Sequence, residues 1–188
     1  WGDRIPRANG PRGATGIYVY TDAEGTIVRT PPSEASQGRM TYLGSKTFEP
    51  DPRFVEAQAR NYDAQAMVEA FDVEGIDLGV VFRTNPLFAD ESQEPMYAYA
   101  IAAAWNDYAA DYASFSPDRI KIAAQIPLHD PEMAAAEARR CIGDLGHVGL
   151  CILPEPINGR AIFHRDFDVL WDAIQETGAP VCIHATSS

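Results

Sequence analysis

The hydrophobic pattern of the chain changes near residue 54. Beyond that point, stretches with helical spacing alternate with short apolar runs. Four apolar residues from Ala64 to Phe71 fall at i, i+3, i+4 and i+7, which predicts a helix, and Gly75 follows where a helix commonly ends. The next run, 76–82, is nearly all apolar and predicts a strand buried on both faces of a parallel sheet.

Three more helix–strand units follow. An aromatic-rich stripe from Tyr97 to Tyr112 has helical spacing and predicts a helix that packs through this stripe. Asp130-Pro131-Glu132 has the N-cap, the N1 proline and the first-turn acid of a helix start. Asp166 is expected to cap the last helix. Apolar runs predict the remaining strands at 120–126, 148–153 and 181–184. In the last helix, the residues expected to face the core are Phe167, Leu170, Trp171 and Ile174.

Repeated strand–helix units with right-handed crossovers fit either a (β/α)₈ barrel or an open doubly wound sheet. No predicted strand is followed by a glycine-rich phosphate loop. Reactive residues follow the strand ends instead, and the carboxyl end is the face that carries the chemistry in barrels. A complete barrel takes about 250 residues. We therefore expect an α/β fold, a partial (β/α)₈ TIM-like barrel containing about strands two to five.

Residues 1–54 are rich in glycine, proline and polar residues. The runs 16–20 and 26–29 predict a β-hairpin, and a long irregular excursion follows. Such an excursion is a lid, an arm for forming a homo-oligomer such as a dimer, or a mobile segment. We divide the chain into this excursion, inserted after a missing first strand, and a partial barrel over 55–188. Both ends look cut, and we expect the missing strands to exist in the native protein.

Composition narrows the partners. The net charge is −12, so the basic footprint of a nucleic-acid-binding protein is missing and an anionic membrane surface would repel the chain. No apolar run is long enough to cross a bilayer and no signal segment stands at the start. The three cysteines, Cys141, Cys151 and Cys182, lie in or beside apolar stretches, which favours buried thiols in a reducing compartment. The expected location is the cytoplasm.

Polar residues that follow the predicted strands are candidate substrate ligands. Arg83 and Asn85 follow the run 76–82, and the fork of an arginine suits a substrate carboxylate, although a salt bridge within the loop would explain it equally well. Glu155 and Asn158 follow the run 148–153. Asn158-Gly159 is also a common turn-forming sequence, which favours a structural role for Asn158.

Four histidines are possible metal ligands. His184 ends an apolar strand, where a core histidine is more common than a ligand. His129 precedes a helix N-cap and is expected to be surface-exposed or to pack in its loop. His147 stands at the start of a strand, on the non-catalytic side, and no motif supports His164. No nucleophile elbow or Cys–His pair predicts covalent catalysis.

An ordered set of motifs resembles the amidohydrolase-related family that includes aminocarboxymuconate-semialdehyde decarboxylase and the hydroxybenzoate-type decarboxylases. The resemblance spans nearly the whole chain. Each motif is short, but their order and spacing match together. They are Asp3-Arg4-Ile5-Pro6-Arg7, Glu74–Phe82, Trp105-Asn106-Asp107-Tyr108, Pro117–Ile120, Ile126–Glu132, Pro156–Arg160, Asp166–Trp171 and Gly178–His184.

The resemblance implies a distorted (β/α)₈ barrel with one divalent metal, most often zinc and in some members manganese. It makes 76–82 the second strand and 181–184 the fifth, so that His184 matches the fifth-strand metal ligand. The other ligands and a proton-shuttling Asp are then expected outside this chain. The implied activity is hydrolysis or non-oxidative decarboxylation of a small carboxylated or aromatic molecule. Two alternatives stay open: a non-catalytic binding or assembly module, and a nucleotide-binding doubly wound sheet.

Overall fold

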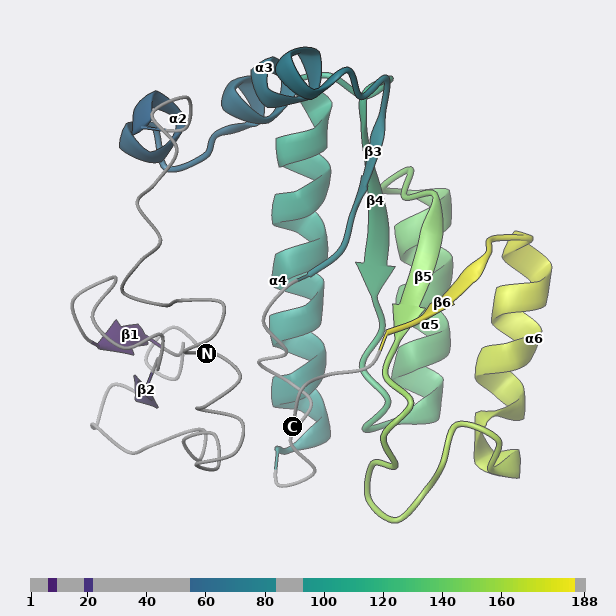
Figure 1. The fold of residues 1–188 in the computed structure, drawn as a ribbon. Coiled ribbons are helices and arrows are strands. Elements are labelled where there is room, and N and C mark those ends of the chain that lie inside the picture. The colour runs from purple at the N-terminus through teal and green to yellow at the C-terminus, as the bar shows by residue number, and fades with distance from the viewer. Residues whose placement is uncertain (1–6, 10–18, 22–54, 84–92, 185–188) are drawn as a thin grey trace. The chain divides into compact units, whose positions relative to one another are not determined.

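The computed structural model describes residues 7–9, 19–21, 55–83 and 93–184, and Figure 1 shows its fold. The chain divides into two compact units, Trp1–Pro52 with Ser187–Ser188, and Arg53–Thr186. In the first unit, β1 (Arg7–Asn9) pairs antiparallel with β2 (Val19–Thr21). The partner predicted for this second strand, 26–29, lies outside the described residues, as do most of residues 1–54.

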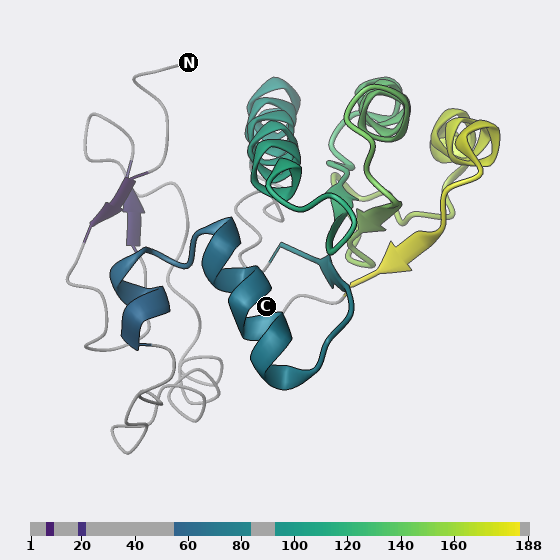
Figure 2. The same cartoon turned by 90° about the horizontal axis from the view of Figure 1, so that it is seen from above.

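The second unit alternates helices with the strands of one parallel sheet. The sheet has four strands in the order β3-β4-β5-β6. The helices α4, α5 and α6 all lie on one face of it (Figure 2). The elements are α2 (Val55–Ala59), α3 (Ala64–Glu74), β3 (Gly79–Val81), α4 (Pro95–Ser114), β4 (Ile120–Gln125), α5 (Pro131–Gly143), β5 (Gly149–Ile152), the 3₁₀ turn η3 (Arg165–Phe167), α6 (Asp168–Thr177) and β6 (Val181–Ile183).

The strand order identifies the fold class. Each strand pairs in parallel with the next one along the chain, from Gly79↔Ile120 through Ala123↔Gly149 to Leu150↔Val181. A doubly wound sheet reverses its strand order at a switch point and carries helices on both faces. A barrel keeps one order and places its helices outside. The predicted α/β fold, a partial TIM-like barrel, is therefore confirmed.

The sheet is curled. Phe82 and His184 stand directly after its two outer strands, and their ring centroids lie 5.9 Å apart. Three strand spacings on a flat sheet with perpendicular side chains would separate such rings by at least about 14 Å. The two rings meet because the sheet bends towards the face opposite α4, α5 and α6. We call this the concave face.

Two apolar clusters fill the convex side. The larger packs β4 and β5 against α5 and α6, and Phe167, Leu170 and Ile174 are buried there as predicted, with Trp171 packed beside them. The smaller packs β4 against α3 and α4, with the predicted face of α3 towards it. The left-handed Gly75 and Gly178 end α3 and α6, as their positions predicted.

Three local predictions were wrong, the first of them only in part. The stripe on α4 packs only in part: Tyr97 is buried and Trp105 and Tyr112 pack against the core, but Tyr108 is 62% exposed. The helix also buries small residues (Ala98, Ala102 and Ala109) around Asn106, since these allow close approach to the sheet. The run 76–82 is not buried on both faces: in the described sheet β3 has a partner on one side only, and Val80 is 44% exposed. Full burial of both faces holds for β5.

The third wrong prediction is the cap of the last helix. The chain first forms η3, and the N-cap of this turn is His164, whose Nδ1 accepts a hydrogen bond from the Asp166 backbone N–H at 3.3 Å. The Asp166 carboxylate instead forms an ion pair with Arg160, with 3.3 Å between Oδ2 and Nη1. Asp166 therefore forms an ion pair across the loop and does not cap the helix.

Within the described residues, no helix is long and apolar enough to cross a membrane.

Candidate functional site

The concave face carries a row of polar and sulfur-containing side chains. Ala124 and Ile126 pack into the core on the convex side, so Gln125 between them points to the concave face. The same alternation directs Cys151 and Cys182 there. The three residues are in register across β4, β5 and β6. They form a continuous row on the inner wall of the partial barrel.

His184 lies one step further along the same face. It is two residues beyond Cys182, and its backbone N–H donates to the Ile152 carbonyl at 3.1 Å. Its main chain therefore continues the sheet, and its exposed ring faces Phe82. The carboxyl end of a barrel strand is a rigid mount for a metal-binding imidazole.

His184 fits a divalent cation as a single imidazole ligand. Across residues 55–83 and 93–184, no group of three or more His, Cys, Asp or Glu side chains is arranged to hold a metal. A complete set of three or more such ligands would therefore need residues beyond these ranges, in line with what the resemblance implied. The role of His184 as a ligand stays a prediction.

Arg83 stands after β3, at the same end of the sheet as His184. Its side chain is half-buried, and both terminal guanidinium nitrogens are buried. Asn85 lies outside the described residues. The position of Arg83 is compatible with both predicted roles, which are contact with a substrate carboxylate and a salt bridge within the loop.

The loop after β5 holds the other two candidates. Asn158 and Gly159 both have left-handed φ angles, 52° and 72°. Ile157 and Arg160 exchange two backbone hydrogen bonds of 3.0 Å around them. This is a tight two-residue turn of the kind that asparagine and glycine favour, and Asn158 is exposed in it. Glu155 is half-buried, with one carboxylate oxygen buried. Substrate binding by either residue stays a prediction.

Arg160 connects two loops at this end of the barrel, a role that the sequence analysis missed. Its Nη2 donates to the His129 carbonyl at 3.0 Å, and its guanidinium lies 5.7 Å from the Phe167 ring centroid. It thereby joins the loop after β4 to the loop after β5. His129 is 2% exposed, so it packs in its loop and is not on the surface. The available signal was Arg160 itself, at the end of the Pro156–Arg160 motif.

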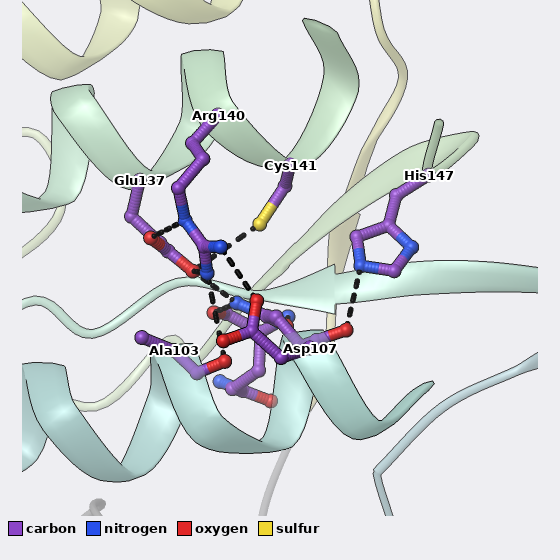
Figure 3. A network of polar contacts seen from close by, with 8 residues as sticks. Ala103, Asp107, Glu137, Arg140, Cys141 and His147 are labelled. Atoms are coloured by element: carbon purple, nitrogen blue, oxygen red, sulfur yellow. Dashed lines mark hydrogen bonds and ion pairs between the residues drawn. The ribbon is translucent and has the colours of Figure 1, made fainter. Parts of the chain in front are cut away.

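A buried polar network lies on the convex side, between α4 and α5 (Figure 3). Glu137 is fully buried and accepts from Arg140 Nε at 2.8 Å and from Asn106 Nδ2 at 2.7 Å. Arg140 also donates to Asp107 at 2.6 Å. The hydrogen bonds of Arg140 to Glu137 and to Asp107 both raise the pKa of Arg140, and the bond to Glu137 has the larger effect. The network is a charged cluster satisfied within the protein, as a buried carboxylate requires.

The side chain of Asn106 in this network takes the place of a strand partner for Gln125. Pairing between β3 and β4 ends at Val81↔Ile122, so within the described ranges no strand pairs with the main chain of Gln125 on that side. Asn106 fills the place: its Nδ2 donates to the Gln125 carbonyl at 3.0 Å, and its Oδ1 accepts from the Gln125 N–H at 2.9 Å. The side-chain amide thus copies a peptide group and fixes the carboxyl end of β4.

Burial shifts the pKa values of His147, Cys141 and Cys151. His147 is buried before β5, at the amino end of the strand, as predicted, and its Nε2 donates to the Asn106 carbonyl at 3.2 Å. Burial lowers the pKa of His147. Burial also raises the pKa of Cys141, and that of Cys151 to about 11. The three cysteines are free thiols, as expected.

Comparison with known proteins agrees with this geometry. The amidohydrolase family model matches residues 42–188. The chain is 28% identical over 153 residues to gamma-resorcylate decarboxylase from Polaromonas sp. strain JS666, covering 77% of this chain and 46% of that protein. It is 26% identical over 131 residues to 2-amino-3-carboxymuconate-6-semialdehyde decarboxylase from Dictyostelium discoideum, covering 70% of this chain and 36% of that protein.

A solved structure shows the same likeness. The crystal structure of 5-carboxyvanillate decarboxylase from Novosphingobium aromaticivorans, with manganese and 4-hydroxy-3-methoxy-5-nitrobenzoic acid, matches with a TM-score of 0.60 at 28% identity. The match covers 77% of this chain and 41% of that one. The chain thus spans about half the length of the relatives it matches. Because the family model matches well over half of this chain, the chain belongs to the amidohydrolase family.

Proposed function

We propose that this chain forms part of a metal-dependent decarboxylase of small hydroxylated aromatic carboxylates. Three observations support the proposal. The chain belongs to the amidohydrolase family. The relatives it matches include decarboxylases of gamma-resorcylate and 5-carboxyvanillate. The concave face offers an imidazole and an aromatic ring side by side at the carboxyl ends of the strands.

The position of His184 carries the proposal. Its exposed ring stands at the carboxyl end of β6, on the concave face, 5.9 Å from the ring of Phe82. In the proposed site His184 binds a divalent metal through a neutral imidazole, and Phe82 offers an apolar wall for an aromatic substrate. When bound, the metal would polarise a substrate oxygen.

Polar residues on the neighbouring loops complete the proposed site. Arg83, at the end of β3, holds the substrate carboxylate with its guanidinium fork. Glu155 and Asn158, in the loop after β5, and Asn85, after β3, are the other proposed substrate contacts. The described part of the chain supplies only binding groups to this site, so the proton donor is assigned to residues beyond it.

The test is metal content of the full-length protein by elemental analysis, with manganese and zinc measured together. About one metal per chain is expected in the wild type, and the His184→Ala variant should lose most of it. His164→Ala is the matched control, because His164 is an exposed histidine at the start of η3. No metal in the wild type, even after metal is added back, would favour the non-catalytic module instead. Equal loss in both variants would contradict the assignment of His184.

Decarboxylation is distinguished from hydrolysis by the product. We expect the metal-loaded protein to release CO₂ from 2,6-dihydroxybenzoate or 5-carboxyvanillate, and His184→Ala to abolish the release. Turnover of ester or amide substrates without CO₂ release would favour a hydrolase on the same scaffold. A homodimer and a cytoplasmic location are part of the proposal, and light scattering tests the first of these.

A further inference from the structure

Gln125 has an unusual environment for a buried polar side chain. It is 4% exposed, and its carboxamide nitrogen is buried without a hydrogen-bond partner among the residues that the structure describes. Three of the other buried polar side chains differ. Asn106, Glu137 and His147 all make hydrogen bonds to the protein. A buried donor left unsatisfied is rare, and it calls for an explanation such as a bound water, an ion or a role in the function of the protein.

The main chain of Gln125 is fixed on both sides. Asn106 holds its N–H and its carbonyl with hydrogen bonds of 2.9 and 3.0 Å. On the other side, the next residue, Ile126, donates its N–H to the Cys151 carbonyl at 3.0 Å. Asn106 is itself held by Glu137. The side chain thus starts from a rigid mount, which favours a single orientation of the free donor.

The side chain of Gln125 lies on the same face of the sheet as the proposed site. Gln125 lies on the concave face in register with Cys151 and Cys182, and His184 is two residues beyond Cys182 on that face. Two strand spacings and two residues along a strand separate Gln125 from His184, about 10 Å across and about 7 Å along the sheet. Curvature brings their side chains closer, so a small aromatic acid can reach both.

We propose that Gln125 is a substrate-binding residue whose carboxamide N–H donates to an oxygen of the bound aromatic acid. The inference rests on the proposed function. An N–H donor selects an acceptor, which in this substrate class is a carboxylate or phenolic oxygen. Enclosure strengthens the bond, because a charged acceptor in a low-dielectric site binds a donor more tightly than it does in water.

The test compares two variants with a matched control in the metal-loaded, full-length protein. Gln125→Met keeps the length and removes the donor, and Gln125→Glu replaces the donor with a negative charge. Gln175→Met makes the same change at an exposed position of α6. The probe is 2,6-dihydroxybenzoate. Its Kd is measured by calorimetry, and the Tm of each variant is measured beside it.

We expect Gln125→Met to weaken binding about tenfold, the loss of one hydrogen bond to a charged oxygen, and to leave the Tm unchanged or higher. Gln125→Glu should weaken binding further, and Gln175→Met should change neither quantity. A Kd for Gln125→Met equal to that of the wild type would overturn the inference alone and leave a buried water as the acceptor. If both Gln125 variants fail to fold, the side chain is structural and the inference is wrong. No binding by the wild type would refute the proposed function, and this inference with it.

Discussion

Asn106 should be among the most sensitive positions for stability in the described part of the chain. Its fully buried side chain makes three hydrogen bonds, two to the main chain of Gln125 and one to the Glu137 carboxylate. Asn106→Ala removes all three and leaves the peptide groups of Gln125 buried without partners. Water cannot replace the lost partners at a site that is closed to solvent.

The expected size of the effect follows from these bonds. Each buried group of Gln125 left unpaired costs about 1–3 kcal/mol, and the bond to a carboxylate contributes about 1.5–3 kcal/mol. Glu137 keeps its bonds to Arg140, so only part of the free energy of the Asn106–Glu137 bond is lost. We expect Asn106→Ala to lower the free energy of unfolding by about 3–5 kcal/mol. A typical domain has only about 5–15 kcal/mol in total.

Urea unfolding followed by circular dichroism and tryptophan fluorescence measures this quantity. Gln175→Ala, at an exposed position of α6, is the control and should change stability by less than about 0.5 kcal/mol. Asn106→Asp should be no better than Asn106→Ala, because it keeps one acceptor but places a second carboxylate beside Glu137. A loss below about 1 kcal/mol for Asn106→Ala would refute the argument that Asn106 replaces a strand partner.

Two further predictions concern packing and pH. Gly79→Ala would place a Cβ 2.5 Å from the Phe71 ring, and we expect a loss of about 1–3 kcal/mol in urea unfolding. Gly143→Ala, where a Cβ meets nothing within 4 Å, should be neutral or stabilising, and equal effects at the two glycines would count against the clash. Burial lowers the pKa of His147, so below its ordinary pKa of about 6.5 the unfolded chain binds more protons than the folded one. The free energy of unfolding should therefore fall as the pH drops from 7.5 to 5.5, less steeply in His147→Gln, and the same slope in both proteins would contradict this assignment.

Local signals in the sequence predicted the helix boundaries well where one interaction within a few residues decides them. Asp130 caps α5 by accepting from the Met133 N–H at 2.9 Å, and Gly178 ends α6 in a left-handed conformation. Asp166 shows the limit of such reasoning. It has the composition of a cap, but Arg160 competes for its carboxylate, and no local pattern announces that ion pair.

Hydrophobic spacing predicted the buried face of α3 and α6, but that of α4 only in part. The period identifies a face only when large apolar residues gather on one side. On α4 the aromatic stripe and the alanine face compete, and close packing on the sheet favours the smaller side chains. Burial of Asn106 in that face was not predictable, because its partners lie 19 and 31 residues away in the sequence.

The sequence by itself determined the order of strands and helices, the family, and the histidine at the end of the last described strand. These depend on local periodicity and on the spacing of short motifs. Only the tertiary structure brought Phe82 against His184 and left the Gln125 donor unpaired beside a row of inward-facing side chains. The physical reason is that curvature and strand register are collective properties of the sheet. They follow from how all four strands pack on the helices, and no single segment encodes them.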